Sequence, residues 1–596
     1  MNPYLAIYPI GHLPSNEKIQ ANLVLEKKLI HNGHYEMEKC LDPLPFTTTI
    51  PWETIPYGDE EWVFALARHS IFTSLCHCYK ETGDKKYLDA LLFHWKDFIR
   101  TQGPGKKTWR SLECGIRAEV WLRIIALLPF EIPFLDEVTD SLRRQGSVLR
   151  ETHTSFHKLS NWGVIGDHGL LALALFFEDK EWEETAVSRL EEELALQTQD
   201  DGSFWEQSPL YHAHVLHSAL DTVRMLRIAN RQDALIETET KKLARSLAGS
   251  CYGKSHLFPQ GDSDLLDCSD LLTEASLLFQ APELFRGVQA ENLLDHSKDA
   301  WRDNQAERKR VSPKTTCFPD SGNWYLRKGA FEVHFHAGFL GSGHGHLDEG
   351  HVDIALDGNL LFGDSGRYTY QDIPVRQELK GPGAHNTLYF AKDAEAKGSW
   401  SYTALAQAFG GRCKETKDVD AVEAYILHPN GELCRRRVIL LSDILIVIDD
   451  LQSEKNEASI AWHAMPKRTP SNYLYSQFLG TTDMRQEPCM MSRCYNILEE
   501  STKQVLEIQG LTAFSLFATK PFTATAIPLT LESDGSPIAE EYGTGLRITM
   551  DGKHIDLISR RKEFIHQVDI VQAGDCHGYG SLLVSIEEKQ TRLFSF

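Results

Sequence analysis

Residues 343–370 read GHGHLDEGHVDIALDGNLLFGDSGRYTY, and His385-Asn386-Thr387 follows shortly after them. This stretch gathers histidine and aspartate residues into a region with β-strand character, behind roughly 300 residues with helical periodicity. It predicts a metal-assisted active site at the junction of a helical domain and a β domain. Residues two apart on a strand face the same way, so His344 and His346 can converge on one site if this segment is extended.

A hairpin is predicted inside this stretch. Asp357-Gly358 is a dipeptide that type I′ turns prefer, because both central residues need a positive φ angle. A two-residue loop pairs Leu356 with Asn359, and counting outward sets Asp364 level with His351. Asp364 thus returns to the histidine-rich entry of the hairpin, and His351 is kept as a rival of His346 for the role of ligand.

Composition limits the class of protein. The chain has 596 residues and a net charge of −22, from 62 basic and 84 acidic residues. This balance argues against a nucleic-acid partner or an anionic membrane surface, and an acidic substrate would need a local basic pocket. The longest apolar run, 170–177, is far shorter than the roughly 18 residues that a membrane span requires.

Cysteine usage and the N-terminal residues bear on the compartment. Twelve cysteines are scattered without a repeated CxxC pair, which suits a reduced chain better than a disulfide framework. No basic segment precedes an apolar stretch at the start, so a secretory signal is not evident. We therefore expect a cytoplasmic protein, with Cys76 and Cys78 as buried thiols on a helix.

The period of the hydrophobic pattern changes once along the chain. In 87–99 and 216–226, apolar residues recur at three- and four-residue spacing, as on one face of an amphipathic helix. From Phe331 onward the period becomes two, and the runs 438–448 and 546–558 are rich in β-branched residues. We predict antiparallel helix pairs followed by an antiparallel β-sandwich, with the charged stretch 303–319 between them.

These residues resemble the heparinase II/III-like polysaccharide lyases, whose sandwich domain carries an H-x-H pair, a D-x-G-x-x-x-Y segment and an H-N-T. The matching residues here are His344-Gly345-His346, Asp364-Ser365-Gly366 with Tyr368 and Tyr370, and His385-Asn386-Thr387. The helical half also contains short motifs similar to those of the family's toroid: Gly115-Ile116-Arg117 with Trp121, Ser160-Asn161, and Asp201-Gly202 leading through Glu206 and Ser208 to Tyr211-His212. The resemblance covers the chain from about residue 60 to the C-terminus.

The resemblance implies an incomplete α/α toroid in residues 1–310, an antiparallel β-sandwich in residues 311–596, and β-elimination on uronic-acid polysaccharides. Glycosaminoglycan oligosaccharides are the expected substrates, with alginate-type polyuronates as the alternative. One divalent ion, Zn²⁺ or Mn²⁺ with Ca²⁺ as a further option, would be held by His346, Asp364 and His385. The reacting uronate would be surrounded by Asn161, Tyr211 and His344, and further substrate contacts would come from Arg117, Trp121, Trp162, His212, Arg367 and Tyr370.

The chemistry explains the three catalytic residue types. Removing the C5 hydrogen beside a carboxylate builds negative charge on that carboxylate, so a donor such as Asn161 must stabilise it. A base must take the proton, and an acid must protonate the departing glycosidic oxygen. At neutral pH a free imidazole accepts a proton more readily than a phenol, which favours His344 as the base and Tyr211 as the donor. A nearby cation could reverse this by lowering the tyrosine pKa.

Several of these residues have plain structural alternatives. Ser160-Asn161 could be a helix N-cap, and Tyr211 could be a packing residue. Arg117 and Trp121, spaced i and i+4, could form a cation–π pair instead of a sugar platform. The run Arg435-Arg436-Arg437 looks like a polyanion patch, but a solvated strand edge is the commoner explanation.

The chain also departs from the family pattern, and other classes stay open. Trp162 follows Asn161 where family members often have a histidine. The sequence H-x-H-x-D at 344–348 resembles the start of the metallo-β-lactamase signature, although Glu349 follows it. Glu206 with Asp201 could be the two carboxylates of an inverting glycoside hydrolase. A non-catalytic sugar-binding protein is the remaining possibility, and the oligomeric state is left open.

Overall fold

A computed structural model describes residues 2–6, 15–286, 314–391, 394–452, 457–466, 474–564 and 569–596. The chain forms two compact units. Unit 1 contains Met1–Ser312, Gly366–Arg376 and Ser492–Leu498, and unit 2 contains Pro313–Ser365, Gln377–Met491 and Glu499–Phe596. The predicted boundary at residue 310 lies outside the described residues, as does much of the charged stretch 303–319.

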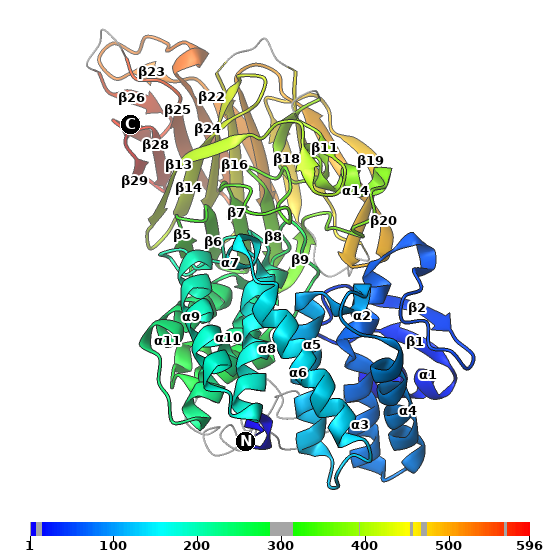
Figure 1. The fold of residues 1–596 in the computed structure, drawn as a ribbon. Helices are drawn as coiled ribbons and strands as arrows, with labels where there is room; N and C mark the ends of the chain where they lie inside the picture. Colours follow the sequence, from blue (N-terminus) through cyan, green and yellow to red (C-terminus); the bar gives the residue numbers. More distant parts are fainter. Residues whose placement is uncertain are drawn as a thin grey trace. The chain divides into compact units, whose positions relative to one another are not determined.

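Unit 1 is an incomplete α/α toroid of helices that pack in antiparallel pairs (Figure 1). The helices are α1 Ser15–Leu25, α2 Glu61–Arg68, α3 Ser70–Thr82, α4 Lys85–Thr101, α5 Ser111–Leu127, α6 Leu135–Glu151, α7 Ser155–Lys158, α8 Asn161–Phe177, α9 Lys180–Gln197, α10 Pro209–Ile228, α11 Ala234–Gly249 and α12 Ser269–Leu278. Two short sheets accompany them, β1 Lys28–His31 with β2 Cys40–Pro45, and β3 Cys251–Tyr252 with β4 His256–Leu257.

The helix predicted over 87–99 is confirmed as α4. Asp84 caps it by accepting a hydrogen bond from the backbone N–H of Lys86 at 3.1 Å. On its apolar face, Leu91, Trp95 and Phe98 are fully buried in the core of unit 1, and Leu92 and Ile99 are partly buried against it. The second predicted pattern, 216–226, lies within α10. None of the described helices has the length and apolar character that crossing a bilayer requires.

Glycines let helices α5 and α8 touch backbone to backbone. A Cβ atom added to Gly169 would lie 2.6 Å from the Cα atom of Gly115, closer than real side chains allow. Since larger residues would force the two helices apart, this contact sets the position of α8. Asn161 is the first residue of that helix.

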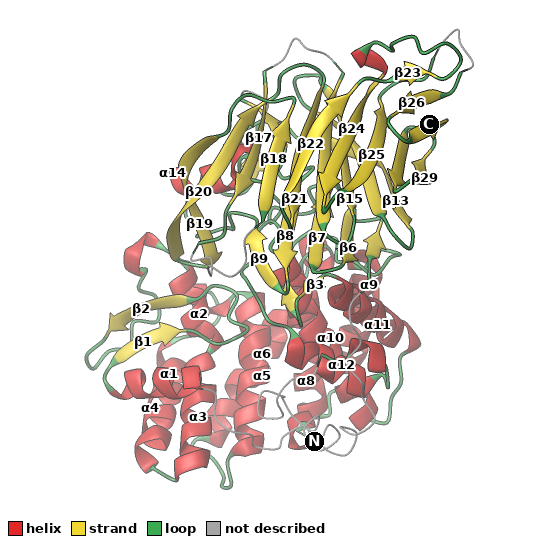
Figure 2. Ribbon diagram, turned by 180° about the vertical axis from the view of Figure 1, so that it is seen from behind, coloured by secondary structure: helices red, strands yellow, loops and turns green. Residues whose placement is uncertain are grey.

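Unit 2 consists of antiparallel sheets, drawn as yellow strands in Figure 2. Its strands are β5 Thr316–Phe318, β6 Asn323–Lys328, β7 Phe331–His336, β8 Val352–Leu356, β9 Asn359–Phe362, β10 Leu388–Phe390, β11 Ala396–Lys397, β12 Ser401–Tyr402, β13 Gln407–Glu415, β14 Asp420–Leu427, β15 Leu433–Leu440, β16 Ile444–Leu451, β17 Ala458–His463, β18 Tyr475–Leu479, β19 Arg485–Cys494, β20 Ile497–Glu507, β21 Thr512–Ala518, β22 Phe522–Ile527, β23 Thr530–Leu531, β24 Gly543–Met550, β25 Lys553–Arg560, β26 Val571–Ala573, β27 Cys576–Gly578, β28 Leu582–Ile586 and β29 Lys589–Phe594. Strands β19 and β20 run through Ser492–Leu498, which belongs to unit 1.

In the six-stranded sheet β13-β14-β15-β16-β21-β18, the central strands β15 and β16 are buried on both faces. Val438 and Val447 pack into one core with the sheet β5-β6-β7-β8-β9. Ile439 and Ile446 pack into a second core with the sheet β22-β24-β25-β28-β29. Because successive residues of a strand enter different cores, the sequence over 438–448 is apolar at nearly every position rather than alternating.

The predicted hairpin is confirmed at its turn but not in its outer register. Leu356 pairs with Asn359, and Asp357 and Gly358 have φ angles of 49° and 73°. A bulge then shifts the pairing, so that Ile354 lies opposite Phe362. The extra residue breaks the outward count that placed Asp364 level with His351.

The prediction of a solvated edge for Arg435-Arg436-Arg437 is wrong. Strand β15 lies inside the six-stranded sheet, and all three arginines are buried. Carboxylates on neighbouring strands compensate them: Arg435 contacts Asp450 at 2.8 Å, Arg436 contacts Asp449 at 3.2 Å and Arg437 contacts Glu423 at 2.6 Å. Burying an arginine is tolerated where carboxylates pair with its charge. Here those carboxylates lie on other strands, so the sequence around the three arginines does not reveal them.

Candidate active site

Tyr211 lies in the first turn of helix α10, where Pro209 occupies an initial helical position. Its side chain is 3% exposed. The hydroxyl group donates a hydrogen bond to Glu38 Oε1 at 3.0 Å and lies 2.5 Å from the hydroxyl group of Tyr370. The phenol of Tyr211 is therefore held in one position by a carboxylate and a second phenol.

Arg367 joins these two tyrosines from the same segment as Tyr370. Its Nη1 donates to the Tyr370 hydroxyl at 2.7 Å and to the Tyr211 hydroxyl at 3.3 Å. Its Nε and Nη2 bind the two carboxylate oxygens of Asp264 at 2.9 and 3.2 Å. Such a forked contact fixes the plane of the guanidinium group. Two of the predicted substrate residues, Arg367 and Tyr370, thus lie beside Tyr211; Arg367 has no exposed surface and serves to hold the two phenols, whereas Tyr370 is half-buried.

The turn before Arg367 requires glycine. Gly366 has a φ angle of +77°, and a Cβ atom there would lie 1.9 Å from the carbonyl oxygen of Ser492. Both the backbone conformation and the close approach exclude a side chain. The glycine of the D-x-G motif therefore has a structural reason, since it lets the chain turn so that Arg367 enters the core of unit 1.

Burial and charge set the protonation of this cluster. Burial raises the pKa of Tyr211 well above its ordinary value, and Tyr370 and Glu38 add to the shift, while Arg367 opposes it. Burial also acts to raise the pKa of Glu38, but Arg68 and Arg367 outweigh it and lower that pKa. At neutral pH Tyr211 keeps its proton and Glu38 is a carboxylate. The cation beside Tyr211 does not turn it into a base, and the arrangement suits a proton donor.

Glu38 was not predicted from the sequence. It lies just before strand β2, and its second oxygen accepts a hydrogen bond from Arg68 Nη1 at 2.6 Å. Glu36 and Glu38 flank Met37 in an unremarkable polar segment. No local motif marks Glu38, because its role comes from the distant residues Tyr211 and Arg68.

Asn161 occupies the start of helix α8, after Ser160 as the N-cap residue. Its amide Nδ2 contacts the two oxygens of Glu206 at 3.3 and 3.2 Å, and its backbone N–H donates to Glu206 Oε1 at 2.9 Å. Asn161 is 1% exposed, and its Oδ1 accepts no hydrogen bond within the described residues. The helix-cap alternative is confirmed for Ser160, while the catalytic role of Asn161 stays a prediction.

Arg117 and Trp121 lie in the core of unit 1, with no exposed surface. Arg117 Nη1 donates to the carbonyl oxygens of Ala67 and Thr108 at 2.9 and 2.8 Å. The indole N–H of Trp121 donates to His69 Nδ1 at 2.8 Å. Side chains without exposed surface cannot contact a sugar in this conformation, so the structure favours packing over the expected substrate platform.

The other two predicted substrate residues differ in exposure. A ring nitrogen of His212 lies 3.0 Å from the carbonyl oxygen of Leu243, and burial lowers the pKa of His212 to about 4. It is a neutral, buried residue between helices. Trp162 keeps part of its surface accessible, and the guanidinium group of Arg110 lies 4.7 Å from its ring centroid. Of the two, Trp162 is better placed for contact with a ligand.

In unit 2, His346, Asp364 and His385 form a buried cluster. Each offers a ligand atom, and these atoms all lie within 4.8 Å of one another. His385 Nδ1 is 2.7 Å from Asp364 Oδ2, while His385 Nε2 is buried and makes no hydrogen bond within the described part of the chain. Two imidazoles and a carboxylate are donors that divalent ions such as Zn²⁺ accept, so these residues fit a metal ion.

The rival ligand His351 lies outside this group. Its Nδ1 accepts a hydrogen bond from the backbone N–H of Asn386 at 2.9 Å, and its Nε2 lies 3.0 Å from Asp353 Oδ1. The other oxygen of Asp353, Oδ2, lies 2.8 Å from Nδ1 of His334 on the neighbouring strand β7. These residues form a buried polar layer that holds the loop of His385 in place.

The histidine pair of the H-x-H motif does not lie on a strand. Residues 341–351 form turns between β7 and β8, where the backbone N–H of Gly345 donates to the carbonyl oxygen of Ser342 at 3.1 Å. His346 is buried, whereas His344 is half-buried and packs edge-on against Trp400, with ring centroids 5.6 Å apart. The segment is therefore not extended, so the condition under which the two histidines would face the same way is not met, and the role of His344 stays a prediction.

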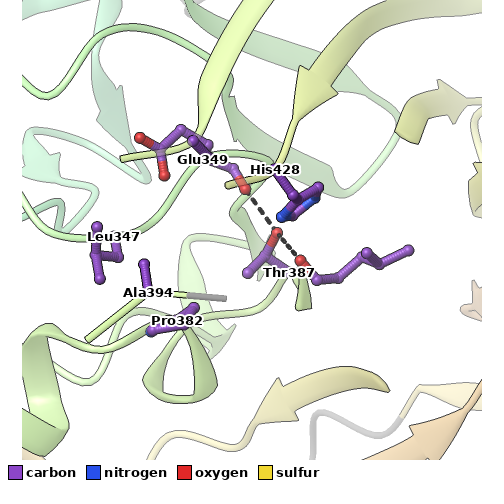
Figure 3. Close-up of a pocket in the computed structure, with 8 residues that line it drawn as sticks. Leu347, Glu349, Pro382, Thr387, Ala394 and His428 are labelled. Atoms are coloured by element: carbon purple, nitrogen blue, oxygen red, sulfur yellow. Dashed lines mark hydrogen bonds between the residues drawn. The ribbon is translucent and has the colours of Figure 1, made fainter. Parts of the chain in front are cut away.

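Residues next to the metal-type ligands line a small pocket, drawn in Figure 3. Leu347 and Thr387 take part, together with Glu349 and His428. Thr387 Oγ1 donates to the carbonyl oxygen of Glu349 at 2.7 Å. The pocket has a volume of about 10 Å³, which is room for a single water molecule. It is too small for a sugar and belongs to the packing of this loop.

The fold places the chain among proteins that combine an α/α toroid with antiparallel β-sheets. Residues 14–252 match the heparinase II/III N-terminus, and residues 310–501 match the heparinase II/III-like C-terminal domain. The chain therefore belongs to the heparinase II/III-like family, as its motifs suggested.

Individual relatives are distant. A heparin-sulfate lyase of Bacteroides thetaiotaomicron is 21% identical over 431 residues, which cover 66% of this chain and 61% of the relative. A heparin-sulfate lyase of Pedobacter heparinus is 28% identical over 201 residues, covering 31% of this chain and 30% of the relative. The chain thus spans 61% or less of the length of these two curated relatives. A crystal structure of heparinase III has a TM-score of 0.73 at 15% identity, covering 94% of this chain and 93% of that one, so the two share a fold.

Proposed function

We propose that the chain is a polysaccharide lyase that cleaves uronic-acid-containing glycans by β-elimination. Glycosaminoglycan oligosaccharides of the hyaluronan, chondroitin or heparan type are the proposed substrates, with alginate-type oligosaccharides as the alternative. The observation that carries the proposal is the Tyr211 phenol, kept protonated by burial and held by Glu38, Tyr370 and Arg367. The names of the two curated relatives support the glycosaminoglycan class.

The proposed reaction assigns one role to each of three side chains. His344 takes the C5 proton of the uronate, the electron pair forms the C4–C5 double bond, and the C4–oxygen bond breaks. Tyr211 gives its proton to the departing glycosidic oxygen. The Asn161 amide stabilises the charge that develops on the uronate carboxylate. The products are a 4,5-unsaturated uronate end and a free hydroxyl group on the leaving sugar.

A panel of hyaluronan, chondroitin sulfate, heparan sulfate, heparin and alginate tests this function. Elimination produces ultraviolet absorbance from the unsaturated end, and the product masses add up to the mass of the substrate. Hydrolysis by Glu206 and Asp201 would instead add the mass of one water and leave no absorbance. Asp201 Oδ1 accepts hydrogen bonds from Ser203, and Glu206 binds Asn161, so both carboxylates have local structural partners.

We further propose that His346, Asp364 and His385 hold one divalent ion, of Zn²⁺ or Mn²⁺ type with Ca²⁺ as a further option. When bound, the ion would tie the His385 loop to the segment after hairpin β8–β9 and supply positive charge there. The supporting observations are the buried donor set and the lack of a hydrogen-bond partner at His385 Nε2 within the described residues.

The variant His385→Ala is expected to lose this ion, because two remaining ligands hold a divalent metal weakly. Elemental analysis of the purified chain measures the loss. His554→Ala, which removes an exposed histidine on strand β25, is the matched control and should keep its metal. Full occupancy in His385→Ala would show that His385 is not a ligand.

A further inference from the structure

A second set of metal-binding side chains lies in unit 2. Cys317 is on strand β5, and Cys413 and Glu415 are on strand β13. Their ligand atoms all lie within 4.8 Å of one another, and the two thiols hydrogen-bond to each other. Both cysteines are free and half-buried. None of these residues takes part in the site proposed above.

The topology explains why these three residues meet. Strand β5 is an edge strand of the sheet β5-β6-β7-β8-β9, and β13 is an edge strand of the six-stranded sheet. Cys413 and Glu415 pair regularly with Val422 and Asp420, so they lie two residues apart on one face of β13. Cys317 comes from the other sheet, and both cysteines pack against the core that the two sheets share.

We propose that Cys317, Cys413 and Glu415 bind a thiophilic divalent ion of the zinc class. Two thiolates and a carboxylate supply three ligands, and water completes a tetrahedron. Zn–S bonds of ~2.3 Å place the donors of such a site roughly 3.5–3.8 Å apart. Because the Glu415 side chain is exposed, it can rotate to this distance. Binding replaces the two thiol protons by the metal ion and releases them to solvent.

The charged groups around the Cys317 and Cys413 thiols favour the binding of a cation over redox chemistry of the two thiols. Reactive thiols generally lie near positive charge, which stabilises the thiolate. Here the hydrogen bond with Cys317, burial, and the carboxylates of Glu415 and Asp420 all raise the pKa of the Cys413 thiol. Lys328, which pairs with Asp420 at 3.1 Å, and Lys314 are the cations near Glu415. A divalent ion compensates the carboxylate and both thiolates together. It would also link the edges of two sheets that no backbone hydrogen-bond ladder connects among the described strands.

Cobalt titration of the reduced, full-length chain tests the site, because Co²⁺ bound to thiolate has a charge-transfer absorption band that histidine and carboxylate ligands do not produce. The metal cluster of His346, Asp364 and His385 therefore cannot imitate the signal. Because the cluster of His346, Asp364 and His385 can also take up Co²⁺ without giving the band, up to two equivalents of Co²⁺ are expected to produce the full band, and Zn²⁺ should abolish it. Cys317→Ser and Cys413→Ser should lose it, whereas Cys489→Ser, a half-buried cysteine on strand β19, should keep it.

Glu415→Gln separates ligation from folding, since Glu415 is exposed. The band should persist in this variant, while the affinity for Co²⁺ falls at least ~10-fold. An unchanged affinity would remove Glu415 from the site. A wild-type chain that is saturated with Co²⁺ and shows no band, or a band that survives in Cys413→Ser, would overturn the proposal.

Discussion

Tyr211→Phe is expected to lower turnover by ~10²-fold or more, the usual scale for a lost proton donor. The substitution keeps the buried ring and removes only the hydroxyl group that contacts Glu38, Tyr370 and Arg367. Arg68 still binds Glu38 Oε2, but the buried Oε1 loses its hydroxyl donor, so folding stability should fall by about 1–3 kcal/mol. Initial rates of unsaturated product, with thermal unfolding of the same sample, measure both effects.

Tyr87→Phe is the matched control for this experiment. Tyr87 is also a buried helical tyrosine, and its hydroxyl donates to Asn22 Oδ1 at 2.8 Å, outside the Tyr211 cluster. It should lose less stability, because water can replace the hydroxyl at the exposed Asn22, and it should retain its activity. If Tyr211→Phe turned over within a few-fold of the wild-type rate, Tyr211 would not be the proton donor.

His344→Ala is expected to reduce turnover by a similar ~10²-fold or more, because the proposed reaction loses its base. His344 is half-buried in a loop and packs against Trp400, so its removal should change stability little. Added imidazole should restore part of the activity if the missing function is proton transfer. Steady-state rates with and without imidazole measure this.

His554→Ala serves again as the control, since it removes an exposed histidine from strand β25. Its rate should match that of the wild-type chain and should not respond to imidazole. Near-normal turnover in His344→Ala would exclude this residue from the mechanism. A reduced rate that imidazole leaves unchanged would instead indicate a structural role.

Local patterns predicted the elements well where each depends on its own residues. The spacing of Leu91, Trp95 and Phe98 specified one face of α4, and Asp357-Gly358 specified the hairpin turn. In both cases the relevant interactions are short-range: an amphipathic surface and a pair of backbone angles.

Prediction failed where a distant segment determined the outcome. A bulge shifted the hairpin register, and turns replaced the extended H-x-H segment. Arg435-Arg436-Arg437 looked solvated because the acidic residues that compensate its charge lie on other strands. For the same reason, nothing near Glu38 in the sequence marked it as a neighbour of Tyr211.

The sequence by itself determined the change from helical to strand periodicity, the family, and the residue types that lyase and metal chemistry require. The tertiary structure alone decided that Arg117 and Trp121 are buried and that Glu38 and Arg367 contact the Tyr211 hydroxyl. Periodicity and motifs are properties of neighbouring residues. Exposure and pKa, in contrast, depend on the charges and surfaces that folding brings together from remote parts of the chain.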